Sequence, residues 1–66
     1  MTWYTAHYKN SNEKYAITTL EGTSNRKEIF KKAQEVANEK KVEVTIIANR
    51  GSGMGEFLKF YKVKPQ

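Results

Sequence analysis

Several residue types that enzymes depend on are absent or scarce in this sequence. The 66 residues include no Cys, no Asp and a single His, His7, so every acid is a Glu. A Ser-His-Asp or Cys-His catalytic site cannot be built from this set. Thiolate-based zinc or iron–sulfur sites are excluded with it, and one His supplies too few ligands for another metal centre. We therefore expect no enzymatic activity, no metal site and no small-molecule cofactor.

Long hydrophobic runs are missing as well. No apolar stretch approaches the ~20 residues that a membrane-spanning helix needs. The first residues lack the basic and apolar regions of a secretion signal. The absence of Cys agrees with a reducing compartment. The sequence predicts a cytoplasmic protein that makes no membrane contact and folds as one small domain over residues 1–66.

Hydrophobic periodicity predicts one helix and four strands. The helix is expected from residue 25 to about residue 40, where apolar residues recur at offsets of three and four. Strands are expected over residues 2–9, 14–20, 42–48 and 56–64, which are rich in aromatic and β-branched residues. The order β-β-α-β-β predicts an α+β fold: a two-layer sandwich of a four-stranded, mainly antiparallel sheet and one amphipathic helix.

The start of the helix has two candidate caps. Asn25 with Glu28 has the spacing of a capping box, in which the first side chain accepts a hydrogen bond from the amide three residues on. Ser24 is an equally suitable cap if the helix begins one residue earlier. The residues from 21 to 25 are expected to break the preceding strand.

The first two strands are expected to pair through a turn at residues 10–13, where Asn and Ser are concentrated. A loop of that length places Tyr8 opposite Tyr15 and Ala6 opposite Ile17. Ile17 then shares a face with Ala6, and Leu20 lies on the opposite face.

One helix can cover only one face of a four-stranded sheet, yet these strands are apolar on both sides. The uncovered face is expected to expose aromatic residues, and such patches commonly mark interaction sites. Because a chain this short builds a small core, we expect a homodimer through this face or through an edge strand of the sheet. The rings could instead pack on one another and on Lys stems. The residues expected in the dimer interface are Trp3, Leu20, Ile47, Phe57, Tyr61 and Val63.

The positive charge is concentrated near the end of the chain. The net charge is +5, and residues 50–66 contain four basic residues against one acid, interleaved with aromatic rings. Sheets that bind nucleic acid use this combination, with cations on phosphates and rings against bases. Lys on an edge strand also prevents unwanted strand pairing, which is the alternative explanation. The expected nucleic-acid-binding residues are Trp3, His7, Arg50, Lys59, Tyr61, Lys62 and Lys64.

A glycine-rich segment at residues 50–55 precedes the last strand. Phosphate-binding loops of dinucleotide or nucleotide sites open a helix, whereas this segment leads into a strand, so a hairpin loop is expected. Arg50 and the loop amides could still hold a backbone phosphate at the sheet edge.

The segment 59–62 has no Gly between its rings, so the signature of RNA-recognition domains is absent. We expect a non-catalytic, homodimeric interaction domain whose ligand is single-stranded or double-stranded nucleic acid. A protein–protein or self-association module without a nucleic-acid ligand is the alternative.

Overall fold

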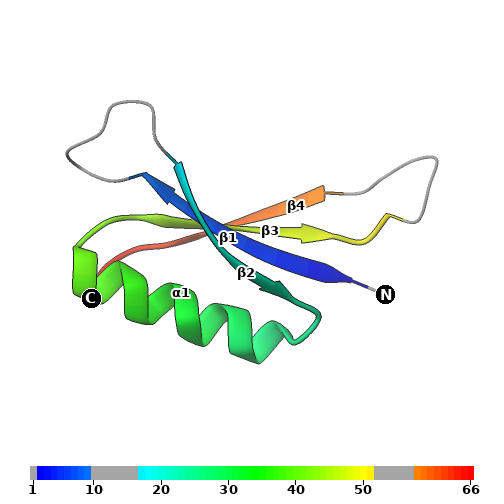
Figure 1. The fold of residues 1–66 in the computed structure, drawn as a ribbon, viewed down its shortest axis with the longest axis horizontal. Helices are drawn as coiled ribbons and strands as arrows, with labels where there is room; N and C mark the ends of the chain where they lie inside the picture. The colour runs from blue at the N-terminus through cyan, green and yellow to red at the C-terminus, as the bar shows by residue number, and fades with distance from the viewer. Residues whose placement is uncertain (1, 10–16, 52–57) are drawn as a thin grey trace.

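The computed structural model describes residues 2–9, 17–51 and 58–66. One helix, α1 (Arg26–Lys40), lies against a sheet of four strands (Figure 1). The strands are β1 (Trp3–Lys9), β2 (Ile17–Thr23), β3 (Val44–Asn49) and β4 (Leu58–Val63). All neighbouring strands are antiparallel, and their order in the sheet is β2-β1-β3-β4. The predicted α+β class and the β-β-α-β-β order are confirmed.

The register of the sheet decides which side chains share a face. Ala6 of β1 lies opposite Ile46 of β3, which in turn lies opposite Tyr61 of β4. Because side chains alternate along a strand, every second residue from these three points toward α1. The residues between them point to the other face, which the helix leaves uncovered.

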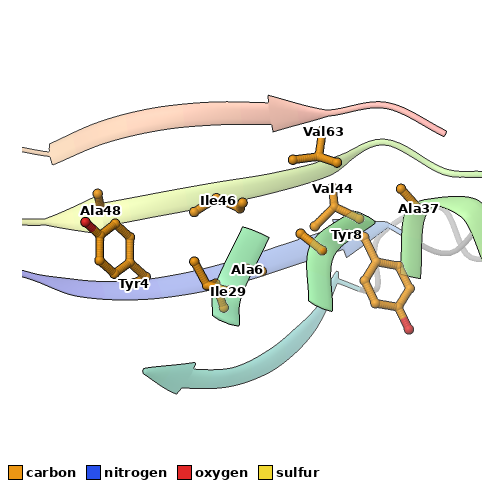
Figure 2. Packing of buried hydrophobic residues seen from close by; sticks show 10 residues of the cluster. Tyr4, Ala6, Tyr8, Ile29, Ala37, Val44, Ile46, Ala48 and Val63 are labelled. Atoms are coloured by element: carbon orange, nitrogen blue, oxygen red, sulfur yellow. The ribbon is translucent and has the colours of Figure 1, made fainter. Parts of the chain in front are cut away.

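The core lies between α1 and the two central strands (Figure 2). Ile29 of the helix and Val44 and Ile46 of β3 are its largest fully buried side chains. Small residues complete it, which lets the helix approach the sheet closely. The ten buried hydrophobic residues are Tyr4, Ala6, Tyr8, Ile29, Ala33, Ala37, Val44, Ile46, Ala48 and Val63. Four of them are alanines, so the core encloses little apolar volume.

The predicted pairing of the first two strands is wrong. Ala6 lies opposite Leu20 rather than Ile17, and β2 continues to Thr23 through the segment that was expected to break it. A shift of three residues moves each side chain of β2 to the other face, because the side-chain period is two. Leu20 therefore packs against the core, and Ile17 is exposed. The expected turn at residues 10–13 lies outside the described residues.

The faces of β4 also differ from the predicted dimer interface. Val63 pairs with Val44 and Tyr61 with Ile46, so both side chains lie on the helix side, where Val63 is buried. Placing Tyr61 and Val63 in an interface on the uncovered face is therefore wrong. Phe57, the third interface residue expected near this strand, lies outside the described residues.

The hydrogen bonds at the C-terminal end of the helix explain why β3 begins later in the sequence than predicted. Lys41 adopts a left-handed conformation with φ 55°, and its amide donates to the carbonyl of Ala37. Val42 donates to the same carbonyl at 3.2 Å. Both amides are thus occupied by the helix terminus, and pairing begins at Val44 rather than at residue 42. No helix within residues 2–9, 17–51 and 58–66 has the length and apolar character needed to cross a membrane.

At its other end, α1 is capped by Asn25. The Asn25 side chain accepts a hydrogen bond from the Glu28 amide at 3.1 Å, as the capping-box spacing predicts. In a complete capping box, the Glu28 side chain would accept a hydrogen bond from the Asn25 amide. Here the Asn25 amide donates to Thr23 Oγ1 instead, at 3.1 Å. The Glu28 carboxylate instead pairs with Lys32 at 3.1 Å.

Substitution of the two candidate caps should separate them clearly. Asn25→Ala removes the hydrogen bond to Glu28 and should lower the free energy of unfolding by about 1 kcal/mol. Ser24→Ala is the matched control and should change it by less than about 0.5 kcal/mol. Urea unfolding followed by circular dichroism measures both values. A larger loss for Ser24→Ala than for Asn25→Ala would contradict the observed cap.

Candidate nucleic-acid interface

The structure divides the predicted nucleic-acid-binding residues between two faces of the sheet. Arg50, Lys59 and Tyr61 come together on the helix side, at the end of the sheet where α1 begins. The side chains of Trp3, His7 and Lys62 belong to the uncovered face, because they alternate with residues of the core. The sequence predicted a single binding surface, and the described residues form two.

On the helix side, these residues surround an open depression that we call the basic hollow. It has a volume of about 290 Å³. The sheet contributes its floor, the first residue of α1 contributes one wall, and the segment after β3 contributes another. The lining residues are Thr2, Tyr4, Arg26, Ala48, Arg50, Lys59 and Tyr61.

The Tyr61 ring contacts two of the positive side chains that line the basic hollow. The Arg26 guanidinium carbon lies 5.2 Å from the ring centroid of Tyr61 and 5.2 Å from that of Phe30. Lys59 Nζ lies 5.5 Å from the Tyr61 centroid. Phe30 meets Tyr61 edge-on, with ring centroids 5.3 Å apart. Cation–π attraction thus holds two positive side chains beside one half-buried ring.

The electrostatics of the basic hollow favour an anion. Arg26, Arg50 and Lys59 are its charged lining residues, and all three are positive. In the described parts of the chain, the ion pairs are Glu28–Lys32 and Glu43–Lys62, and neither includes a lining residue. The three cations therefore repel one another without compensation from these acids. A bound anion would remove that repulsion.

Arg26 was not among the residues predicted from the sequence. The helix sequence carries charges of both signs, so Arg26 does not stand out from its neighbours. A local signal was nevertheless present, because Arg26 precedes Phe30 by four residues, the spacing at which helical side chains meet. Pairing of β4 with β3 then brings Tyr61 to the same place, and that contact depends on tertiary structure.

The uncovered face has an apolar end and a polar end. Trp3 of β1, Asn49 of β3 and Leu58 of β4 form one row across the sheet, and Thr5, Ile47 and Phe60 form the next. We call Trp3, Ile47, Leu58 and Phe60 the apolar patch. Exposed fractions reach 49% for Trp3 and 57% for Phe60.

Gly22 of β2 determines where the Trp3 indole lies. A Cβ atom built on Gly22 would stand 2.5 Å from the indole Nε1, so the ring lies directly over the glycine backbone. Any side chain at this position would displace the ring. The absence of a side chain at Gly22 thus leaves room for the Trp3 indole beside β2.

The polar end of the uncovered face is organised around His7. Its Nδ1 is 3.0 Å from the Thr19 hydroxyl, and its Nε2 is 2.9 Å from the Thr5 hydroxyl. Both ring nitrogens are occupied by hydroxyl groups, which can each donate or accept. Lys62, in the same row, pairs with Glu43 at 3.7 Å.

Lys64 lies apart from both groups. Its backbone carbonyl accepts a hydrogen bond from Gln34 Nε2 at 2.9 Å, which fastens the end of the chain to the middle of α1. The Gln66 amide donates to Asn38 Oδ1 at 2.8 Å and extends this attachment. The basic hollow lies at the start of α1, and Lys64 is not one of its lining residues.

The described residues gather no set of three His or Glu side chains that could hold a metal ion. Comparison with known proteins adds no relative, because no protein-family model, characterised protein or solved structure matches the chain. The two surfaces of the sheet are therefore the features of the molecule that indicate a function.

Proposed function

We propose that this protein is a non-catalytic domain that binds nucleic acid by holding backbone phosphates in the basic hollow. The observation that carries the proposal is the convergence of Arg26, Arg50 and Lys59 around Tyr61, with no acid among the described lining residues. Two of the three are arginines, whose planar guanidinium groups can donate two parallel hydrogen bonds to one phosphate. A cytoplasmic location belongs to the same proposal.

The proposed contacts are made to the phosphates of the nucleic-acid backbone rather than to the bases. The Tyr61 ring already contacts Phe30, Arg26 and Lys59, which limits the ring surface left for a stacked base. Phosphate contacts position a protein on nucleic acid but carry no sequence information. Binding should therefore depend weakly on base sequence and strongly on salt.

The proposed arrangement also explains why the hollow stays open. We infer that the helix and the sheet form two layers and that the sheet extends beyond the first turn of the helix. Arg26, the first residue of α1, then stands at the boundary between covered and uncovered sheet. The N-terminal end of the helix adds a partial positive charge on the same side.

Two lysines on β4 provide a matched test of the proposed face. Lys59 and Lys62 are both exposed, but Lys59 lines the basic hollow and Lys62 lies on the uncovered face. Removing a charge-assisted contact costs about 1.5–3 kcal/mol, so Lys59→Ala should weaken oligonucleotide binding at least about 10-fold. Lys62→Ala removes the same charge and should weaken it less than about 3-fold. Fluorescence anisotropy with labelled single-stranded and double-stranded oligonucleotides measures both.

The salt dependence of the binding constant gives a separate measure of the number of phosphate contacts. With about three contacts on a single strand, the slope of log K against log salt should be about −2, and Lys59→Ala should reduce it by about 0.7. Equal losses for the two lysine variants would show that net charge alone drives binding and would contradict the proposed site. Absence of binding at low salt would contradict the proposed function.

A further inference from the structure

We infer that the apolar patch on the uncovered face binds a second copy of this chain, with the two sheets packed face to face about a two-fold axis. The patch consists of Trp3, Ile47, Leu58 and Phe60, which occupy two adjacent rows across three strands. This inference does not depend on the proposed function, because the basic hollow opens on the other face of the sheet.

The charge distribution favours a second copy over nucleic acid at this patch. In β1, β3 and β4, the positions beside the apolar side chains of these two rows are Asn49 and Thr5, which carry no charge. In β2, the irregularity opposite Thr5 contains Glu21, an exposed acid that would repel a phosphate. Lys62 lies in the following row and is already paired with Glu43. A two-fold axis brings each patch against itself, and the four patch residues carry no charge that would oppose this contact. Phosphates would meet no unpaired cation in these rows.

The size of the uncovered face fits a weak symmetric dimer. Because Trp3 and Leu58 are each 49% exposed and Phe60 is 57% exposed, the patch presents on the order of 300 Å² of apolar surface. The smallest specific interfaces bury about 600 Å² from each partner, and roughly 56–58% of that area is non-polar. The patch therefore supplies most of the non-polar area that such an interface needs. The polar end of the face supplies the rest of the interface area.

His7, at the polar end of the face, can enter such an interface without losing its hydrogen bonds. Both nitrogens of His7 are occupied by Thr5 and Thr19 of the same chain. Burying a polar group is costly when its partner is water and nothing replaces it. Since His7 has its partners within the sheet, covering it leaves no ring nitrogen unsatisfied. Two sheets could then pack about 10 Å apart, the usual separation of stacked sheets.

Because the core is small, binding of a second copy would add to the stability of the folded chain. The helix covers one face with a core in which four of ten residues are alanine. The exposed side chains of Trp3, Leu58 and Phe60 are larger than most of those that the core encloses. Dimerisation would bury them, and two basic hollows would remain open on the outer sides of the assembly.

Sedimentation velocity on the full chain tests this inference through three serine variants. Over about 5 to 500 µM, the wild type should pass from monomer to dimer. Phe60→Ser and Trp3→Ser should each raise the dimer dissociation constant at least about 10-fold. Ile17→Ser is the control, because Ile17 is 65% exposed on the same face but lies outside the patch. It should leave the constant within about 2-fold.

Three results would overturn the inference. The wild type could remain monomeric at the highest concentration, or Ile17→Ser could weaken the dimer as much as Phe60→Ser does. A dimer unaffected by either patch variant would show that another surface, such as the β4 edge, forms the contact. Circular dichroism confirms that each variant is folded. Lys59→Ala should leave dimerisation unchanged, so failure of the nucleic-acid proposal and failure of this inference are distinguishable.

Discussion

Reversing the charge of both arginines in the basic hollow should abolish nucleic-acid binding. In the Arg26→Glu, Arg50→Glu double variant, two proposed phosphate contacts become two repulsive ones. Loss of charge-assisted contacts alone corresponds to about 3 kcal/mol or more, so the dissociation constant should rise at least about 100-fold. Anisotropy with the same oligonucleotides measures the change.

This double variant should remain folded, which makes its loss of binding interpretable. Arg26 is exposed at the first position of α1, and an acid there is favoured by the helix dipole. Arg50 is exposed beyond the end of β3. The control is Lys9→Glu, Lys31→Glu, which changes the net charge equally at two exposed positions outside the hollow. If both double variants lose affinity equally, the hollow is not the site.

Truncating Ile46 should remove a large part of the stability of the domain. Ile46 is fully buried between β1, β4 and α1, and Ile→Ala changes at such positions cost about 2–5 kcal/mol. A chain of this length has roughly 3–10 kcal/mol in total. The core is small and alanine-rich, so few large neighbours can move in to fill the space. Urea or thermal unfolding followed by circular dichroism measures the loss.

The adjacent residue provides the control for Ile46. Ile47→Ala removes the same atoms one position along β3, but on the uncovered face. In dilute solution it should cost less than about 2 kcal/mol and clearly less than Ile46→Ala, because Ile47 is half-buried whereas Ile46 is fully buried. At concentrations where the proposed dimer would form, the cost of Ile47→Ala should grow, because the free energy of unfolding would then include association. An equal loss for the two variants at low concentration would contradict the assignment of the covered face.

The helix and its core face could be predicted from local pattern. Ile29, Ala33 and Ala37 recur at helical spacing, and all three are buried as that spacing predicts. Asn25 caps the helix through an interaction that spans three residues. Contacts within one turn depend on local sequence, so a single sequence is enough to identify them.

The pairing of β1 with β2 could not be predicted, because two registers satisfy the local signals. Ile17 and Leu20 are both apolar, and only one of them can lie against the core. The structure selects Leu20, which packs beside Ala6, and the continuation of β2 to Thr23 accompanies that choice. Gly22, which suggested a strand end, instead accommodates the Trp3 indole.

The basic hollow could be predicted in part, unlike the helix, which could be predicted fully, and the β1–β2 register, which could not. Arg50, Lys59 and Tyr61 were expected to act together, and the structure brings them to one place. Their separation from Trp3, His7 and Lys62 follows from strand alternation once the β3–β4 register is known. That register depends on the connection between the two strands, and the sequence alone left it open.

The proposed site can be tested most directly by a nuclear magnetic resonance titration that reports on the two faces separately. Ala48 and Ile47 are adjacent in β3, with the Ala48 methyl in the basic hollow and the Ile47 methyls in the apolar patch. On addition of a short oligonucleotide, the Ala48 methyl and Tyr61 ring signals should shift, while the Ile47 methyl and Trp3 indole signals should stay in place. Shifts confined to Ile47 and Trp3 would contradict the proposed phosphate site.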